Sequence, residues 1–431
     1  MRGGCVLMVF VLSAIMVAPA RAQTLQEAMA RAFQHHPALD AQRANLRALS
    51  QEIDRARAGR RPSISLTTGA GHHTDGYRGD SGRFVTHERT VAELRLEASQ
   101  PLLDWTTGPQ VDGAYARQQQ GHAELLSTEQ QIMLEVATAY LNVLQYGRLL
   151  DLHNENVRAL ATQVSYRREH YARKLGTRTE LAQARARHAA AIAQRDSVRA
   201  ELDIAASAFM RHVGLPPGEL TFPDDLPQLP DTLDAVMDEA VQRHPAVRSA
   251  YLSVQAAQAD TRAAEGKLKP KLSLDATGGW TQRPELSMNR SRDASVQLNL
   301  RIPIYQGGAD RAQVRSSKER LTQQQANWLD TRLQVRQAAA DAWRKLHTAR
   351  AEIDAFTQAV EANKVAFEGV EAEYSALGDL TLIEVLNAQQ ELFVAEVALV
   401  RAQTQAVLSH LVLLAAQGRL TAEEMGLAHK W

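Results

Sequence analysis

The stretch TLQEAMARAFQHHPAL, from Thr24 to Leu39, returns as TLDAVMDEAVQRHPAV, from Thr232 to Val247. Further phrases recur in the same order, with RPSISL at 61–66 answered by KPKLSL at 269–274, and KLGTRTEL at 174–181 answered by ALGDLTLI at 376–383. A period of roughly 200 residues is far too long for the unit of a solenoid. The repetition therefore predicts a duplicated chain, built from two similar halves related by a pseudo-twofold axis.

The adjacent histidines of this stretch, His35 and His36, suggest a metal site at first sight. The second copy keeps His244 but replaces the other histidine with Arg243, and a metal pair does not obviously survive that exchange. A helix boundary does survive it, because proline suits the first turn of a helix, where its missing N–H has no partner to lose. We therefore interpret the histidine–proline phrase as the start of a helix in each half.

The beginning of the chain predicts export. Arg2 precedes an apolar run at 6–18 and a small-x-small exit that ends at Ala22, which is typical of a cleaved signal peptide. An uncleaved anchor is the alternative, but the run is short for a membrane span. Because Cys5 is the only cysteine, the exported part has no thiol for a disulfide or a thiolate metal site. The predicted organisation is a signal peptide at 1–22, a first repeat at 23–214, a proline-rich linker at 215–231, a second repeat at 232–418 and a C-terminal tail at 419–431.

Composition and motifs argue against several classes of protein. The 49 Lys and Arg residues balance 49 Asp and Glu, whereas nucleic-acid binding calls for a concentrated basic face. No Ser-His-Asp neighbourhood, phosphate loop or HExxH spacing is evident, so we expect neither an enzyme nor a cofactor. His72, His73 and Asp75 come closest to a metal cluster, but they fall in a predicted exposed loop. No segment after the signal peptide reaches eighteen apolar residues without a charge, which predicts no membrane-spanning helix.

Each half continues with an alanine-rich helix, at 37–59 and 245–266, and then changes from a helical period to strict alternation. The alternating segments lie at 63–67, 92–98, 272–276 and 296–302, with polar loops at 72–87 and 283–292. They predict one β-hairpin per half, with one apolar face and one polar face. The side chains expected to face a wet lumen are Glu93, Arg95, Glu97, Gln297, Asn299 and Arg301.

Strands that are apolar outside and polar inside are typical of a membrane barrel. Trp105, Trp280 and Tyr305 lie near strand ends, where interfacial aromatic side chains belong. Four strands cannot close a barrel, and open edges are not tolerated in lipid. Either the strands belong to a soluble domain or several chains share one barrel, and a trimer would supply twelve strands. We favour the shared barrel.

A very long helical pattern follows each hairpin. Apolar residues recur every seven positions from Val136 to Tyr171 and from Leu346 to Tyr374, which is typical of a coiled-coil seam. From Gly108 to Leu175 there is no proline after Pro109. One helix of about 65 residues, roughly 100 Å long, is therefore expected.

Glycines end both long helices, at Gly176 and Gly378, and a return helix follows each. His153, Arg167 and Lys174 interrupt the first seam. They are either ordinary polar positions of the heptad pattern or side chains that face an aqueous bore.

Taken together, these features resemble the TolC-type outer-membrane efflux family over essentially the whole exported chain. The resemblance rests on the duplicated opening, one hairpin per half, the strand-to-helix junctions SQPLLDWTTG (99–108) and RIPIYQGG (301–308), and the turns GTRT (176–179) and GDLT (378–381). It implies a mainly α homotrimer whose twelve-stranded β-barrel crosses the outer membrane of a Gram-negative bacterium, while a twelve-helix α-barrel extends into the periplasm. It also implies a periplasmic adaptor and an inner-membrane transporter of RND, ABC or MFS type as partners, for export of drugs, metals or proteins.

The resemblance further implies functional residues at the periplasmic tip. Carboxylates after the second turn narrow the pore in the family, and the matching position here is Glu384, with Asn387 three residues further on. In the first half the matching position holds Ala182 in place of an acid, while Arg178 is a candidate tether for a closed tip. Glu384 and Arg178 are equally well explained as solvated residues at helix starts, where Glu suits the helix dipole. The turns expected to dock the adaptor contain Gly176, Thr177, Gly378 and Asp379.

The alternative function is that of a periplasmic adaptor or a structural coiled-coil protein of the cell envelope. An adaptor predicts one helical hairpin flanked by small β domains. The sequence shows two similar halves, each with its own amphipathic strand pair. The duplication therefore favours the channel.

Overall fold

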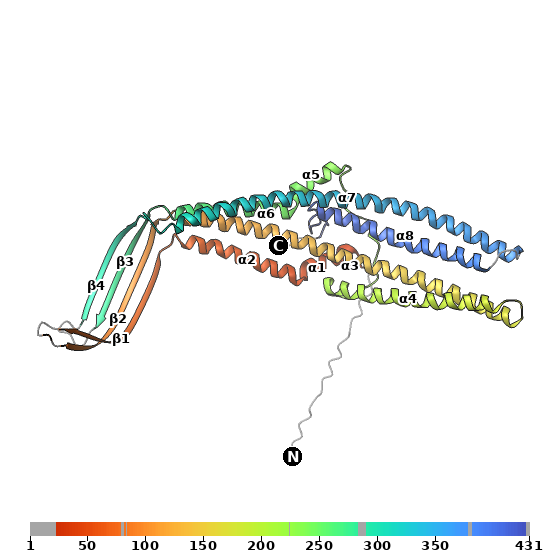
Figure 1. Ribbon diagram of the computed structural model, residues 1–431, viewed down its shortest axis with the longest axis horizontal. Coiled ribbons are helices and arrows are strands. Elements are labelled where there is room, and N and C mark those ends of the chain that lie inside the picture. The colour runs from red at the N-terminus through yellow and green to blue at the C-terminus, as the bar shows by residue number, and fades with distance from the viewer. Residues whose placement is uncertain are drawn as a thin grey trace, which may run out of the picture.

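The protein is elongated, with a β-sheet at one end and a helical rod at the other (Figure 1). The computed structural model describes residues 23–78, 82, 84–223, 225–282, 290–377 and 382–427, so the predicted signal peptide at 1–22 lies outside the described residues. The elements are α1 (Leu25–His35), α2 (Pro37–Ala58), β1 (Ser63–Arg78), β2 (Phe84–Leu103), α3 (Thr107–Ala172), α4 (Arg178–Val213), α5 (Leu233–Arg243), α6 (Pro245–Gly266), β3 (Lys271–Gln282), β4 (Arg290–Arg301), α7 (Ala309–Leu377) and α8 (Leu382–Ala416). The same order of elements occurs twice, which confirms the predicted duplication.

A helical corner opens each half. His36 joins α1 to α2 and His244 joins α5 to α6, each in an extended conformation that caps the following helix. The Nδ1 atom of His36 accepts a hydrogen bond from the Ala38 N–H at 3.3 Å. The equivalent bond from the Ala246 N–H to His244 is 3.1 Å long. The histidine–proline phrase is thus a helix boundary, as predicted, although the short helices before it, α1 and α5, were not foreseen.

The four strands form one antiparallel sheet in the order β1-β2-β3-β4. Glu97 lies opposite Ser65 and Thr277, whereas Leu96 lies opposite Leu66. Directly opposed residues point to the same face of a sheet. All six predicted lumen residues therefore share one polar face, and the apolar alternation occupies the other.

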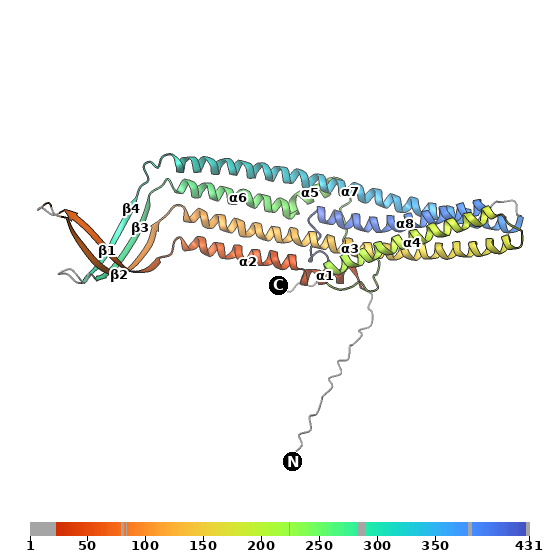
Figure 2. The ribbon, with the colours of Figure 1, turned by 60° about the horizontal axis from the view of Figure 1, so that its bottom comes forward.

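The first hairpin is longer than the second. Among the described residues, the last pair between β3 and β2 is Gln282 with Ala92, and β2 continues to pair with β1 beyond that point (Figure 2). The predicted loop at 72–87 is therefore wrong, because most of it belongs to β1 and β2. The ladder continues there because backbone hydrogen bonds do not require an apolar face. Of the second predicted loop, 283–289 lies outside the described residues and 290–292 belongs to β4.

Two long helical hairpins form the rod. α3 and α7 have 66 and 69 residues, and their return helices α4 and α8 have 36 and 35. α3 coincides closely with the helix predicted between Gly108 and Leu175. In Figures 1 and 2 the α3–α4 and α7–α8 pairs run side by side away from the sheet.

α8 departs from the expectation that no helix is long and apolar enough to cross a membrane. Among the described residues, Ile383–Ala416 meets that test by length and composition, with a mean hydropathy of 1.4. Its packing accounts for its apolar character, because α8 contacts α7 and α3 and fully buries Leu411, Leu413 and Leu414.

The main core lies where α1, α3, α4, α8 and the C-terminal tail meet. Tyr140 of α3 is fully buried there. Its hydroxyl lies 2.7 Å from the carbonyl oxygen of Gln23 and 2.6 Å from that of Thr221. The tail packs into the same core, since the Ala422 N–H donates to the Glu129 carboxylate at 2.6 Å. These contacts tie the start of the described chain, the linker and the tail to α3.

Candidate functional site

The apolar face of the sheet is uncovered in a single chain. Its most exposed members are aliphatic, with between 49% and 72% of their surface accessible: Ile64, Leu66, Leu96, Val296, Leu298 and Leu300. A contiguous apolar surface of this kind marks contact with another apolar phase. Within the described residues, β1 and β4 are edge strands that each pair on one side only. Such edges need a further strand before they can enter lipid.

The polar face carries a hydrogen-bonded cluster around Asp275. Its carboxylate accepts from the Ser273 hydroxyl at 2.8 Å, the Ser99 hydroxyl at 2.5 Å and the Asn299 side-chain amide at 2.5 Å. The predicted lumen residue Asn299 is thereby fixed across the strands. Asp275 itself was missed by sequence reasoning, although its alternation with Leu274 and Ala276 placed it on the polar face.

Arg95 and Glu97, two further predicted lumen residues, approach each other at 4.0 Å on the same face. Glu93 lies beside Gly69, and Gln297 lies opposite Asp275. Arg301 lies opposite Lys271. The face thus presents both charge signs and amides, and it can line a water-filled passage.

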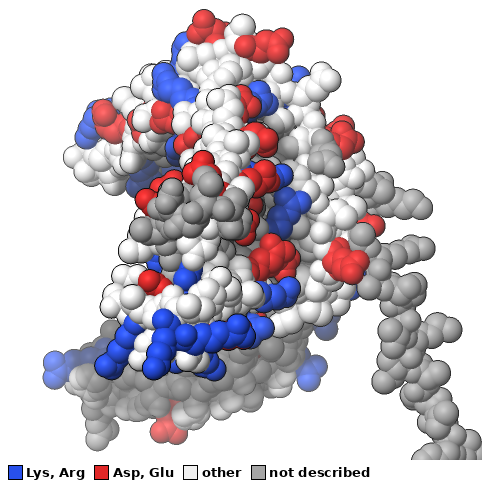
Figure 3. Space-filling model, turned by 90° about the vertical axis from the view of Figure 1, so that its right-hand side faces the viewer, with Lys and Arg blue, Asp and Glu red and all other residues white. Residues whose placement is uncertain are grey.

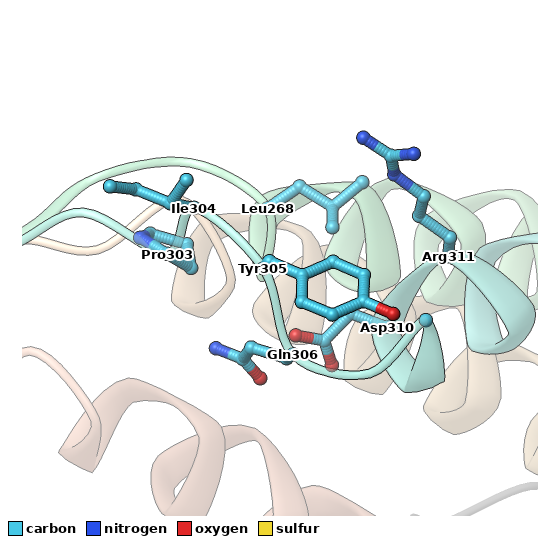
Figure 4. Close-up of a pocket in the computed structure, with 8 residues that line it drawn as sticks. Leu268, Pro303, Ile304, Tyr305, Gln306, Asp310 and Arg311 are labelled. Atoms are coloured by element: carbon cyan, nitrogen blue, oxygen red, sulfur yellow. The ribbon is translucent and has the colours of Figure 1, made fainter.

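The junction between sheet and rod is rich in exposed aromatic and aliphatic side chains. Tyr305 and Ile304 lie on the loop between β4 and α7, with Leu268 beside the tyrosine (Figure 4). Tyr305 is 81% exposed, and Trp105 at the equivalent junction of the first half packs under the Lys269 ammonium at 4.7 Å. Amphipathic aromatics of this kind suit the edge of a bilayer.

The predicted tip residues fall at the far end of the rod. Thr177 caps α4 by accepting from the Glu180 N–H at 3.2 Å, just after Gly176, and Arg178 is exposed beside it. Glu384 is exposed in the first turn of α8. Gly378 and Asp379 lie outside the described residues.

Asn387 makes a contact between the two helical hairpins that the sequence did not predict. Its side-chain oxygen accepts from the Arg187 guanidinium of α4 at 3.0 Å. A basic side chain of the first half is therefore held against the predicted gate position of the second half.

Arg167 is the main tip residue that sequence reasoning did not assign. It is 6% exposed, and its guanidinium lies 3.6 Å from the Glu180 carboxylate and donates to the Tyr374 hydroxyl of α7. The break in the heptad seam was the signal that could have found it. Of the other two breaks, His153 is buried and Lys174 is exposed at a positive φ of 61°. The seam is therefore interrupted by buried polar groups as well as solvated ones.

The two tips carry opposite charge. Residues 165–190, around the Gly176 turn, contain seven Lys and Arg and two Asp and Glu. The window with the same spacing around Gly378, residues 367–392, contains six Asp and Glu and no Lys or Arg. Figure 3 looks onto this end of the molecule, where basic side chains form a band low down over the α3–α4 tip and acidic ones gather higher, over α7 and α8.

An amphipathic sheet with open edges, joined to a long rod of paired helices, defines an outer-membrane channel of the shared-barrel type. The sequence profile of the family described as "Outer membrane efflux protein" matches residues 28–215 and 236–419, one match per repeat. The chain belongs to this family. It is an outer-membrane channel of the kind used in tripartite efflux and type I secretion systems.

Individual relatives agree over most of their length. The chain is 31% identical to the outer membrane efflux protein BepC of Brucella suis biovar 1 (strain 1330), over 95% of this chain and 88% of the relative. It is 25% identical to the outer membrane protein TolC of Escherichia coli (strain K12), over 94% of this chain and 84% of that protein. The crystal structure of the Campylobacter jejuni CmeC outer membrane channel shares the fold, with a TM-score of 0.81, 14% identity, and coverage of 92% and 86%.

Members of the family are channel proteins. Within the described residues no group of three His, Cys, Asp or Glu side chains is placed to hold a metal ion. His72 instead approaches the Glu88 carboxylate of the neighbouring strand at 3.8 Å.

Proposed function

We propose that three copies of this chain form one exit duct, in which the sheets close a twelve-stranded barrel and the helical hairpins form a periplasmic tube. The observation that carries the proposal is the sheet, which has an uncovered apolar face, an opposite polar face and two open edges. A homotrimeric barrel accounts for all three features. Its apolar face meets lipid, its polar face lines the duct, and each β4 edge pairs with the β1 edge of the next copy. The predicted signal peptide at 1–22 is removed on export, and the linker at 215–231 joins the repeats.

The helical tips are the proposed docking end for a periplasmic adaptor, which connects the duct to an inner-membrane transporter of RND, ABC or MFS type. The docking turns contain Gly176, Thr177, Gly378 and Asp379. The opposite charges of the two tips support this role, because an alternating basic and acidic ring would favour one register of a partner. The duct has no proposed catalytic role.

The gate is proposed to lie at the same tips. Glu384 narrows the pore as an acidic ring, Asn387 links the hairpins through Arg187, and Arg178 is a further tether. Arg167 joins this set, because it holds Glu180 and Tyr374 together from a buried position. The Arg167 side chain is buried and that of Glu180 is 35% exposed. Leaving the buried guanidinium without its carboxylate is destabilising, so a change here should loosen the closed end.

Conductance in planar bilayers tests both parts of the proposal. The full chain should insert as a trimer with stable single-channel steps, and it should fractionate with outer membranes. Protein that remains a soluble monomer would overturn the duct.

Glu384→Gln should lower the preference for cations or the block by divalent ions. Unchanged selectivity and block would remove Glu384 from the gate. Glu180→Gln should raise the resting conductance. Glu169→Gln is the matched control, because Glu169 pairs with the exposed Arg173 at the end of its own helix. Equal conductance in these two variants would remove the Arg167 contact from the gate.

A further inference from the structure

A second feature of the rod lies away from the turns and is not explained by gating. A groove of about 410 Å³ runs where α8 packs across the α3–α4 hairpin. Its volume falls in the range of small-molecule sites, roughly 300–1,000 Å³. Small side chains leave room here, because α4 contributes Ala190 and Ala191 to the lining.

The chemistry of the groove is one-sided. Twelve described residues line it, and none of them is acidic, whereas Arg187, Arg401 and His153 are basic and three more carry side-chain amides. Arg187 and Arg401 lie toward opposite ends of the groove, because Arg187 donates to Asn387 of α8 and Arg401 lies fourteen residues further along that helix, or about 21 Å. Phe393, Val394 and Val397 form an apolar floor between them.

One lining residue, His153, is a buried polar side chain with a ring nitrogen left unpaired by the described residues. His153 is 4% exposed, and its Nδ1 has no hydrogen-bond partner within the described residues. Its ring is held edge-on against Phe393, with the ring centres 5.0 Å apart. Burial, and to a lesser degree Arg401, lowers the pKa of His153. A buried polar group without a protein partner is uncommon, and this nitrogen is free to bond to a molecule in the groove.

Two carboxylates, Glu155 of α3 and Glu396 of α8, lie close in sequence to lining residues but do not line the groove. Burial raises the pKa of Glu396, and the charge of Glu155 raises it further. Neither side chain lines the groove. The acidic groups nearby are thus set apart from the space, and the cations and amides face it.

We propose that this groove binds an anionic amphiphile, meaning a small molecule with a carboxylate, sulfonate or sulfate group on an apolar body. Arg401 or Arg187 takes the anion, and His153 and the amides supply further hydrogen bonds. The apolar part lies on Phe393 and the valines. Because the groove touches both helical hairpins, the occupant also links α8 to the α3–α4 pair.

The site is formed between the two hairpins, and its residues do not follow the duplicated plan. Counted from the turn glycines, the second-repeat position that corresponds to Arg187 is Gln389, and the one that corresponds to His153 is Ala355. Arg401 belongs to the second repeat, and its first-repeat counterpart is Arg199. The three basic groups of the groove therefore come together only where α8 meets the α3–α4 hairpin. The groove excludes Glu384 and Arg178 but shares Arg187 with the proposed link to Asn387. Arg401, which takes no part in that link, is therefore the position to change when occupancy is tested.

Calorimetric titration of the full-length trimer with naphthalene-2-sulfonate tests the proposal. The cation 2-naphthylmethylammonium, of similar size, is the matched probe and should not bind. Arg401→Gln should weaken sulfonate binding about ten-fold or more, because a charge-assisted hydrogen bond is lost. Arg199→Gln, which removes the same charge from an exposed position on α4, is the control and should bind as the unaltered protein does.

Two further measurements test sulfonate binding independently if Arg401→Gln does not fold. Ala190→Phe fills the groove without changing charge, and it should abolish sulfonate binding while the trimer remains intact. The imidazole NMR signal of His153, assigned by its loss in His153→Gln, should shift as sulfonate is added. Equal binding of both probes, or binding unaffected by Arg401→Gln and Ala190→Phe, would overturn the proposal.

Discussion

The two repeats share one plan but differ at their ends. In the middle, both have a histidine-capped corner, a hairpin and a long helical pair, with the same hydrogen bond at His36 and His244. At the membrane end the first hairpin extends beyond the second. At the far end the first tip is basic and the second is acidic. The duplicated plan sets the fold, and the repeats diverge at the membrane end and at the tips proposed to meet a partner.

The central anchor is expected to show the largest difference between the repeats. Tyr140 of α3 ends the phrase ATAY, and Trp343 of α7 ends the similar phrase ADAW, one position out of step with the spacing of the turn glycines. Tyr140 is fully buried and bonds to two other segments, whereas Trp343 is half-buried against His347. Tyr140→Ala should therefore lower the free energy of unfolding by about 3–5 kcal/mol, and Trp343→Ala by less.

Thermal unfolding of the solubilised trimers measures this difference. Tyr140→Phe keeps the ring and removes only the hydroxyl, so it should cost about 1–3 kcal/mol. Equal losses for Tyr140→Ala and Trp343→Ala would show that the repeats are anchored alike.

The glycines that follow α4 and α8, Gly214 and Gly418, provide a second comparison between the repeats. Both glycines have a positive φ, 84° and 77°, so alanine at either should cost roughly 1–2 kcal/mol. An added Cβ at Gly418 would also lie 2.8 Å from the His244 Cα, whereas at Gly214 nothing lies within 4 Å. Gly418→Ala should therefore lower the melting temperature more than Gly214→Ala. The reverse order would contradict the packing of α8 against the second corner.

The second corner should also respond to acid. Burial lowers the pKa of His244 in the native state, and an unfolded histidine titrates near pH 6.5. Below that pH the unfolded chain binds a proton that the native chain resists, so stability falls as pH drops. His244→Asn keeps a good helix cap and should flatten the fall between pH 7.5 and 5.5. His153, His212 and His410 shift in the same direction, so a residual slope is expected.

His36→Asn is the control, because it removes the equivalent imidazole cap from the first corner. Melting temperature against pH is the measurement for both variants. An unchanged slope in His244→Asn would assign the acid sensitivity to other groups.

The smallest expected effect is a gain in stability. Gly369 lies inside α7, and an added Cβ would meet no atom within 4 Å. Gly369→Ala should stabilise the protein by about 0.5–1 kcal/mol, because glycine loses more backbone entropy in a helix. A loss of stability would mean that the position is covered in the assembled protein.

The sequence predicted what periodicity and repetition encode. The two halves, the bounds of the long helices and the two faces of the sheet all follow from apolar spacing and from matched phrases. It did not predict α1 and α5, because they lie before the proline that marked the helix start. The extension of β1 and β2 was missed because His72 to His87 lacks an apolar face, and a ladder can form without one.

At the candidate site, the sequence predicted where the tip residues lie but not which side chains contact one another. Glu384 and Asn387 fall at the tip as expected. Arg167 contacts Glu180 across the Gly176 turn, and it contacts Tyr374 about 200 positions away in the sequence. Both contacts depend on how the helices pack, which the sequence pattern does not show. In the sequence Arg167 was visible only as a break in the heptad pattern.

The duplication also predicts how neighbouring copies meet, and this is the most direct test of the shared barrel. Within one chain Ala98 of β2 lies opposite Ala276 of β3. The equivalent positions in the other repeat are Leu300 of β4 and Thr68 of β1. These two strands are separated within a chain by β2 and β3, or about 14 Å, which is too far for a disulfide. Leu300 should therefore face Thr68 of the next copy.

The measurement is disulfide formation in the double variant Thr68→Cys, Leu300→Cys, in which the mature chain carries no other cysteine. Oxidation of the membrane-inserted protein should give covalent dimers and trimers on a denaturing gel, which reduction dissolves, while either single variant should stay monomeric. Uncrosslinked monomers alone in the oxidised double variant would contradict a barrel closed by three copies in the register of the repeat.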